Sequence, residues 1–164
     1  MKKNTASSLW LEEDISTIAQ EHAGQANNCL TLCFKSRSEN VAVARIMASS
    51  IMANSNITLA ELDEIKVAVS EAVSNAIIHG YQNRTDGWVE TAFELHNDIL
   101  SITIHDEGIG IENIEEAMRP HFSNGKDRMG LGFAFMNSFM DEVKVTSAPL
   151  CGTTVVLIKK ICQH

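Results

Sequence analysis

The longest regular pattern of apolar positions in the chain runs from Leu59 to Tyr81. Its apolar residues recur at steps of one, three and four, which is the spacing of one face of an α-helix. These residues are Leu62, Ile65, Val69, Val73, Ala76 and Ile77. Thr58 and Glu61 form the sequence signature of a capping box at the start, and Gly80 is a typical helix end. The pattern predicts one long helix whose apolar face packs on a core.

A second, polar row lies within the same run. Glu71, Asn75 and His79 are spaced by four, so a helix aligns them along another face. A carboxylate, a carboxamide and an imidazole held in register can serve a metal–phosphate site, in which the carboxylate is free to act as a base. A solvated helix face has the same pattern, so the helix alone leaves both interpretations open.

The remaining elements follow from alternation and from helical spacing. Alternating apolar and polar residues predict strands in residues 29–36, 88–95, 98–105, 143–149 and 152–161. Helical spacing predicts further helices in residues 38–55, in a short stretch after Ile111 and around 133–140. Asp86 and Gly87 are the strongest local hairpin signal. This order predicts the α+β class: a two-layer α/β sandwich with helices on one face of a mixed, mostly antiparallel sheet.

The composition fits one globular domain with an appendage. The chain has 164 residues, of which 45% are apolar and 21% charged, an ordinary balance for a folded protein. Residues 1–28 are polar, apart from a small apolar cluster between Leu9 and Ile18, and we expect them to form an N-terminal extension of a domain at 29–164. No apolar stretch approaches the roughly 20 residues that span a bilayer, and no signal peptide is apparent. A cytoplasmic protein is therefore expected.

Charge and cysteine spacing narrow the classes of partner. The formal net charge of −8 argues against a general affinity for nucleic acid and leaves room for a basic protein partner. An anionic cofactor needs a site whose local charge differs from the negative net charge of the chain. The four cysteines form neither a CxxC pair nor a zinc-type cluster, and we expect free, partly buried thiols. They are Cys29, Cys33, Cys151 and Cys162.

Two glycine motifs lie at predicted junctions. The sequence DEGIG, from Asp106 to Gly110, follows a strand, and GLG, from Gly130 to Gly132, opens a helix. Glycine suits positions where backbone comes close to a ligand, and amides at a helix N-terminus bind anions. Each motif alone is weak, because tight connections also use glycine. The chain contains neither a P-loop nor a Rossmann fingerprint.

Taken together, the three motifs resemble those of the GHKL ATPase superfamily, which has the Bergerat ATP-binding fold. The runs SEAVSNAIIHGY, DEGIGI, RMGLGF and FMDEV are most similar to the anti-sigma-factor serine kinases, closest to the sporulation anti-sigma F factors. The resemblance extends from about Phe34 to Lys160, which is most of the chain. It implies ATP and Mg²⁺ as cofactors.

The resemblance assigns roles on the long helix and in the first glycine motif. Asn75 is expected to coordinate Mg²⁺ and to contact the nucleotide, and Glu71 to act as the general base that takes the proton of a substrate serine. Asp106 is expected to accept a hydrogen bond from the adenine amino group. Gly108 and Gly110 are expected to let the nucleotide lie close to the backbone. His79 is expected to be structural.

Further roles follow for the second glycine motif and the first helix. Gly130, Leu131 and Gly132 are expected to bring backbone amides to the phosphates. Residues 119–129 resemble the ATP lid, in which Arg128 is expected to contact the γ-phosphate and act in catalysis, with Lys126 as a further nucleotide contact. Arg45, on the first predicted helix, matches a position that the family uses to bind partner proteins, although a surface arginine without a role fits equally.

The function implied by the resemblance is that of a homodimeric anti-sigma factor. Such a protein holds an RNA polymerase sigma factor of the sigma F type inactive and, as an ATP-dependent protein serine kinase, phosphorylates a STAS-type anti-anti-sigma factor. Direct contact with nucleic acid or membrane is not expected. The lid is about two residues short, and Met129 replaces a small hydroxyl residue, so lid closure is expected to differ in detail.

Two other functions compete with this one. A nucleotide-gated module that binds a sigma factor without turnover would need the same pocket. A histidine-kinase catalytic domain would need a preceding helical hairpin that carries a phospho-accepting histidine, and about 28 residues with only His22 are too short for one. The intact pair Glu71 and Asn75 favours the kinase over the module without turnover.

Overall fold

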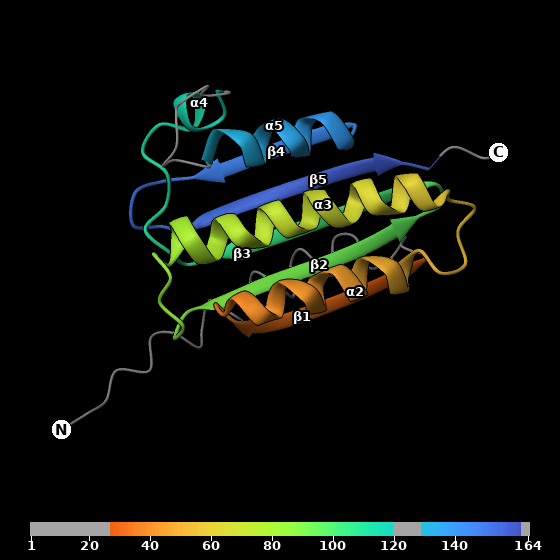
Figure 1. The fold of residues 1–164 in the computed structure, drawn as a ribbon, viewed down its shortest axis with the longest axis horizontal. Helices are drawn as coiled ribbons and strands as arrows, with labels where there is room; N and C mark the ends of the chain where they lie inside the picture. Colours follow the sequence, from red (N-terminus) through yellow and green to blue (C-terminus); the bar gives the residue numbers. More distant parts are fainter. Residues whose placement is uncertain (1–26, 120–128, 162–164) are drawn as a thin grey trace.

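The protein folds as a five-stranded antiparallel sheet with helices on one face. The computed structural model describes residues 27–119 and 129–161, and the strand order in the sheet is β1-β2-β3-β5-β4. Helices α2, α3 and α5 lie side by side over the sheet, with α3 in the middle (Figure 1). The strands are β1 (Asn28–Lys35), β2 (Trp88–His96), β3 (Ile99–Asp106), β4 (Glu142–Ser147) and β5 (Thr153–Lys160). The helices are η1 (Ser38–Asn40), α2 (Val41–Ile51), α3 (Leu59–Asn75), η2 (Ala76–Gly80), α4 (Ile114–Ala117) and α5 (Met129–Phe139).

Helix α3 is the central element of the helical layer. Its start is fixed by the predicted capping box: the Glu61 amide donates to Thr58 Oγ1 at 3.2 Å, and the Thr58 amide donates to Glu61 Oε2 at 2.9 Å. Its inner face is buried against the sheet through Ile65, Ala68, Val69, Ala72 and Val73. The predicted apolar face is therefore confirmed.

The end of this helix differs from the prediction. The α-helical pattern stops at Asn75, and η2 is a π-helical turn, in which the Tyr81 amide donates to the Ala76 carbonyl at 2.9 Å. A π turn has five-residue hydrogen bonds and is wider than an α turn. The four-residue row therefore keeps its α-helical alignment only between Glu71 and Asn75, and His79 follows on the wider turn.

The sheet supplies the other half of the core. The side chains that face the helices are mostly buried in β2, β3 and β5, whereas β4 is half-buried and Phe34 is the buried one in β1. The largest fully buried ones are Phe93, Leu100, Ile102, Ile104 and Leu157. The register pairs Asp106 with Thr153 at one end of β3 and β5, so both sit at the same edge of the core. Both are buried polar residues at the end of an otherwise apolar layer.

The fold class is confirmed, with local corrections. All four strand pairings in the described residues are antiparallel, whereas a mixed sheet was expected. Asp86 and Gly87 lie between η2 and β2 and form no hairpin; the β2–β3 turn is at Asn97, which has a φ of 51°. The expectation of partly buried thiols is wrong for Cys29, Cys33 and Cys151, which are exposed.

Two expectations lie wholly or mostly outside the described residues. Nearly all of the proposed extension at 1–28 falls before residue 27, and Cys162 follows residue 161. Within the residues that the structure does describe, no helix is both long enough and apolar enough to cross a bilayer.

Candidate functional site

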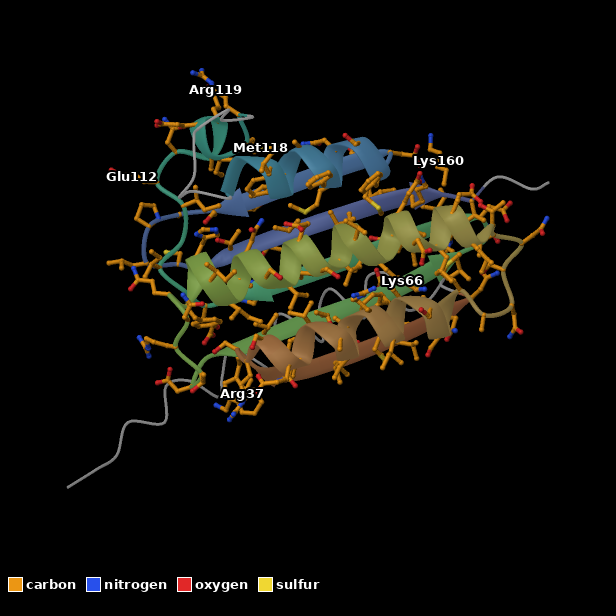
Figure 2. All side chains as sticks on the ribbon, in the orientation of Figure 1. Arg37, Lys66, Glu112, Met118, Arg119 and Lys160 are labelled. Atoms are coloured by element: carbon orange, nitrogen blue, oxygen red, sulfur yellow. The ribbon has the colours of Figure 1, made fainter. Side chains whose placement is uncertain are left out.

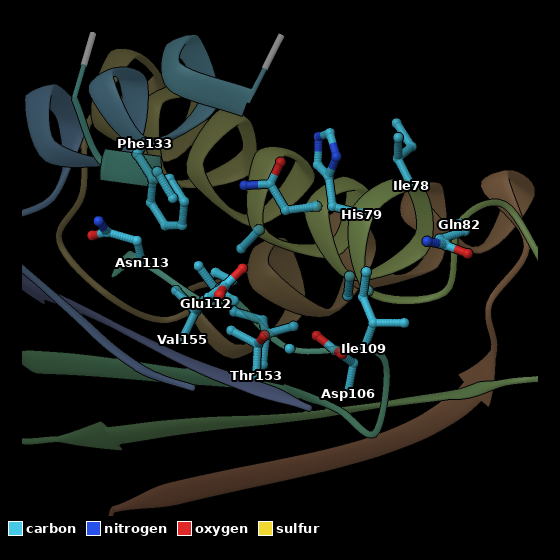
Figure 3. A pocket seen from close by; sticks show the side chains of 18 of the residues that line it. Ile78, His79, Gln82, Asp106, Ile109, Glu112, Asn113, Phe133, Thr153 and Val155 are labelled. Atoms are coloured by element: carbon cyan, nitrogen blue, oxygen red, sulfur yellow. The ribbon is translucent and has the colours of Figure 1, made fainter. Parts of the chain in front are cut away.

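A cavity of about 900 Å³ opens at the end of the helical layer where α3 meets α5. Its floor comes from β3 and β5, through Asp106, Thr153 and Val155, and its walls come from η2, the loop after β3 and α5 (Figure 3). The rest of the lining is Ala72, Asn75, Ala76, Ile78, His79, Gly80, Gln82, Ile104, Ile109, Gly110, Ile111, Glu112, Asn113, Glu116, Ala117 and Phe133. Three of the expected site residues, Asn75, Asp106 and Gly110, therefore share one cavity.

Asp106 is a buried carboxyl group at the cavity floor. Its residue is only 3% exposed, and its Oδ1 accepts a hydrogen bond from the Gly108 amide at 2.9 Å. Burial raises the pKa of Asp106 to about 6, while the backbone amides of Gly108 and Thr153 and the charge of His105 act in the opposite direction. At neutral pH the site therefore holds a carboxylate acceptor in a largely apolar setting. Such a group suits the amino group of a planar, apolar ring.

The turn after β3 packs directly on the end of η2. A Cβ on Gly108 would lie 2.3 Å from the Gly80 carbonyl oxygen, and one on Gly80 would lie 2.6 Å from Asp106 Oδ1. The Ile109 amide donates to the Gly80 carbonyl at 2.9 Å. Contact with η2 therefore requires glycine at position 108, and the expected approach of the nucleotide to this backbone stays a prediction. Gly108 positions Asp106.

The β4–β5 turn fixes the same loop from the other side. Gly110 and Gly152 both have positive φ, 71° and 74°. A Cβ on Gly110 would lie 2.0 Å from the Ala148 carbonyl oxygen, and one on Gly152 would lie 1.9 Å from that of Asp106. The Leu150 amide also donates to the Ile109 carbonyl at 2.7 Å. The loop that carries Asp106 is therefore clamped between two backbone segments.

Sequence reasoning gave Tyr81, Gly80 and Gly152 no role in the site, although it identified Gly80 as the helix end. The buried Tyr81 hydroxyl donates to the Trp88 carbonyl and accepts from the Glu107 amide at 2.9 Å, so it ties the β3 turn to the start of β2. The sequence signals for these residues are a Gly-Tyr pair at a helix end and a glycine directly before a strand. Both are common in ordinary turns, which is why they gave no functional expectation.

Glu71 and Asn75 face the first turn of α5; Asn75 lines the cavity, whereas Glu71 and Gly132 are not among its lining residues. A Cβ on Gly132 would lie 2.9 Å from Glu71 Oε2 and 3.4 Å from Asn75 Nδ2. The structure thus brings together the polar row of α3 and the second glycine motif. Gly130, Leu131 and Gly132 all lie in the first turn of α5, where backbone amides have no intrahelical acceptor. This end of α5 therefore offers amide donors beside a carboxylate.

Asn75 carries an unsatisfied polar atom. Its Nδ2 is buried and has no hydrogen-bond partner among the described residues, which is costly unless a ligand supplies an acceptor. The described residues contain no group of three histidine, cysteine or acidic side chains that could hold a metal ion. Mg²⁺ at phosphate sites needs only one or two protein ligands, because waters and phosphate oxygens supply the rest. The carboxamide oxygen of Asn75 is of the type that would hold Mg²⁺ there, and Nδ2 would donate to a phosphate oxygen.

The other expected residues divide into three groups. His79 lines the cavity, although it was expected to have only a structural role. Arg45 is exposed on α2 and is not among the cavity residues. Lys126 and Arg128 lie outside the described residues. Among the cavity residues that are described, Asp106, Glu112 and Glu116 are acidic and none is lysine or arginine.

The comparisons with known proteins agree with this geometry and with the expected resemblance. The sequence profile of the histidine kinase-like ATPase domain matches residues 34–159. The anti-sigma F factor of Clostridium beijerinckii is 45% identical over 137 residues, which cover 82% of this chain and 96% of that protein. The anti-sigma F factor of Geobacillus thermodenitrificans is 46% identical over 138 residues, which cover 83% of this chain and 94% of that protein.

A solved structure supports the fold. The RsbU and RsbW domains of a Mycobacterium tuberculosis protein superpose with a TM-score of 0.57 and 17% identity, covering 82% of this chain and 32% of that one. At this identity the likeness concerns the fold alone. The profile and the two relatives, however, span most of the chain. The chain therefore belongs to the histidine kinase-like ATPase family, as a nucleotide-binding domain of the group that includes the anti-sigma F factors.

Proposed function

We propose that this protein is an anti-sigma factor that binds Mg²⁺ and ATP in the cavity, inhibits an RNA polymerase sigma factor and phosphorylates a serine of an anti-anti-sigma factor. The observation that carries the proposal is that Glu71 and Gly132 meet at Asn75, which lines the same cavity as the buried Asp106. The names of the relatives, anti-sigma F factor, support the sigma-factor partner.

Nucleotide binding divides between the two sides of the cavity. Asp106 accepts the hydrogen bond of the adenine amino group, and the apolar side chains of Ile104 and Val155 contact the ring. Asn75 and the first-turn amides of α5 hold the metal–phosphate end. Because the described part of the cavity is acidic, a triphosphate needs cationic compensation, which favours Mg²⁺ as an obligatory companion of the nucleotide.

Glu71 is positioned for proton transfer in the kinase reaction. Bound Mg-ATP supplies the phosphoryl group. Glu71 takes the proton of the serine hydroxyl as the serine oxygen bonds to the γ-phosphorus and the bond from that phosphorus to the leaving ADP oxygen breaks. Asn75 and the α5 amides hold the reacting group against Glu71, and Arg128 stabilises its charge as expected from the family.

Partner choice follows the nucleotide state. The sigma factor binds when ATP is bound, and the unphosphorylated anti-anti-sigma factor releases it, because the two partners have different affinities for the two nucleotide states. The protein acts as a homodimer, and Arg45 on the exposed side of α2 contacts the partners. The anti-anti-sigma factor is of the STAS type.

A phosphorylation assay tests the kinase. The protein is incubated with labelled ATP, Mg²⁺ and the anti-anti-sigma factor, and phosphoserine is measured for wild type, Glu71→Gln and Glu94→Gln. Glu94 follows the buried Phe93 on β2 and so lies on the sheet face away from the helices, which makes this variant the matched control. Wild type and Glu94→Gln are expected to label the substrate, and Glu71→Gln to lose at least about 100-fold in rate.

The same variants distinguish the kinase from a module without turnover. Equal labelling by wild type and Glu71→Gln, or none by wild type, contradicts the kinase. If, in addition, ATP-dependent binding of the sigma factor is retained and reversed by the anti-anti-sigma factor, the protein is a nucleotide-gated binding module.

A further inference from the structure

The solvent side of α5 has an unusual composition for a surface helix. The inner face is buried through Phe133, Met136 and Met140, as the helical spacing predicts. The outer face carries Leu131, 51% exposed, and Phe135, 45% exposed. No charged residue occurs between 129 and 139, although surface helices normally place charged side chains toward water.

The polar side chains of α5 do not make its outer face more polar. Asn137 Nδ2 donates to the Phe133 carbonyl at 2.9 Å, and Ser138 Oγ donates to the Ala134 carbonyl at 2.8 Å, so both are bonded back to their own helix. The Phe135 ring stacks on Phe139 with centroids 6.0 Å apart. The outer face of α5 is therefore apolar and held in place.

The exposed side of α5 adjoins α3 beside Glu71. At one end Gly132 lies against Glu71, as described above. At the other end Lys159 Nζ donates to the Phe139 carbonyl at 2.6 Å and to Glu64 Oε2 at 3.4 Å, which places the end of α5 beside the first half of α3. The two helices are thus antiparallel neighbours, and Phe135 lies between these two points of contact.

Helix α3 adds one residue to this surface. Val67 is 38% exposed and lies one turn before Glu71 on the same helix face. Together, Val67, Leu131 and Phe135 form an apolar area that we call the α3–α5 patch. It borders Glu71 along α3 and across to α5. In Figure 2, α5 runs between the α4 end of the helical layer, marked by Glu112 and Arg119, and the opposite end, marked by Lys160.

We propose that the α3–α5 patch is the docking surface for the protein substrate of the kinase, a folded protein that presents its serine from an apolar surface. The inference rests on the proposed function. A serine on a protein reaches Glu71 only if the surface around that serine covers what surrounds Glu71, and the patch is the apolar part of those surroundings. The sigma factor donates no hydroxyl to Glu71, so its binding does not require contact with the surroundings of Glu71.

Steady-state phosphorylation kinetics test the proposal. The full chain is assayed with the anti-anti-sigma factor as the varied substrate, in wild type, Phe135→Glu, Val67→Glu and Leu59→Glu. Leu59 is 82% exposed at the far end of α3, so Leu59→Glu is the matched control for a new charge on the helical layer. ATP affinity and thermal unfolding of each variant are measured alongside, and Phe135→Ala is included because it removes the ring without adding charge.

The patch variants are expected to raise the KM for the protein substrate at least about tenfold, with ATP affinity and kcat close to wild type. Leu59→Glu is expected to match wild type. An unchanged KM in Phe135→Glu and Phe135→Ala overturns the docking surface while the kinase stands, as does a selective loss of sigma-factor binding. Absence of phosphorylation by wild type overturns both the proposed function and the docking surface.

Discussion

The two sides of the cavity differ in how completely the protein satisfies its own polar groups. On the Asp106 side, the loop after β3 is held by Gly80, Tyr81, Ala148 and Gly152, and Asp106 accepts a backbone hydrogen bond. On the Glu71 side, Asn75 keeps a buried amide nitrogen without a partner. The first side is thus built by the chain alone, whereas on the second the described residues leave a donor that the proposed nucleotide would satisfy.

This difference is consistent with the proposed function, in which the Asp106 side recognises the base and the Glu71 side carries out the phosphate chemistry. A prebuilt base site selects the nucleotide without reorganisation, which lowers the free-energy cost of binding. Under the proposed function, the Asn75 side would gain most from bound Mg²⁺ and phosphates, so its interactions would depend on the nucleotide state. Substitutions that loosen the loop after β3 should therefore destabilise the free protein, whereas loss of the Asn75 carboxamide should not.

The largest effect is expected from Gly152→Ala. The added Cβ would collide with the Asp106 carbonyl and would hold an alanine at a φ of 74°, so the free energy of unfolding should fall by about 2 to 4 kcal/mol. Urea denaturation measures this. The exposed neighbour Cys151 provides the control, because Cys151→Ala should change stability by less than about 0.5 kcal/mol. Equal stabilities for the two variants would contradict the clamped loop.

Asp106→Asn should stabilise the free protein at high pH while it weakens ATP binding. Burial raises the pKa of Asp106 from 3.8 to about 6, so the folded state binds this proton more tightly than the unfolded state. The stabilisation from protonated Asp106 is fully present below pH 3.8 and is lost as pH rises through about 6. Above pH 6 the ionised carboxylate costs on the order of 2 to 3 kcal/mol, which Asp106→Asn avoids.

The measurement is urea denaturation of both proteins between pH 4.5 and 8, with ATP binding followed at pH 7.5. The stability of Asp106→Asn relative to wild type should rise across this range and level off above pH 7, while ATP affinity falls sharply. A stability difference that does not change with pH would show that burial of the carboxylate is not the cause.

Tyr81→Phe should have an intermediate effect. Loss of the hydroxyl leaves the Glu107 amide and the Trp88 carbonyl without this partner, which costs about 1 to 2 kcal/mol of stability. Because the turn after Asp106 loosens, ATP affinity should also fall by a few fold. Differential scanning calorimetry and a nucleotide titration test both effects. A loss of stability with unchanged ATP affinity would mean that Tyr81 does not position Asp106.

The sequence predicted the parts of this molecule that local patterns determine. The capping box at Thr58 and Glu61 and the apolar face of α3 follow from spacing alone, and both are confirmed. The pairing of Glu71 with Asn75 is a property of one helix. Their meeting with Gly132 required a resemblance to a known family, because it depends on how α5 packs against α3.

What the sequence did not predict depends on contacts between distant segments. The π turn at 76–80 has the composition of an ordinary helix end. Gly152 matters because its neighbour is Asp106, 46 positions earlier in the chain (152 − 106), and no local pattern carries that information. Asp86 and Gly87 have hairpin chemistry, but the chain reaches them from a helix and not from a strand.

The smallest change in the stability of the free protein is expected from Asn75→Leu. This variant tests most directly whether the two sides of the cavity differ. Leucine is close in size and has no polar atom to leave unpaired, so the free energy of unfolding without nucleotide should stay the same or rise by up to about 1 kcal/mol. In wild type, Mg²⁺ and ATP at 100 times Kd should add about 2.7 kcal/mol of stability. Asn75→Leu should lose that gain, and so should wild type when EDTA replaces Mg²⁺. If Asn75→Leu instead destabilises the free protein by 2 kcal/mol or more, the carboxamide is a structural group, and the Glu71 side of the cavity is as prebuilt as the Asp106 side.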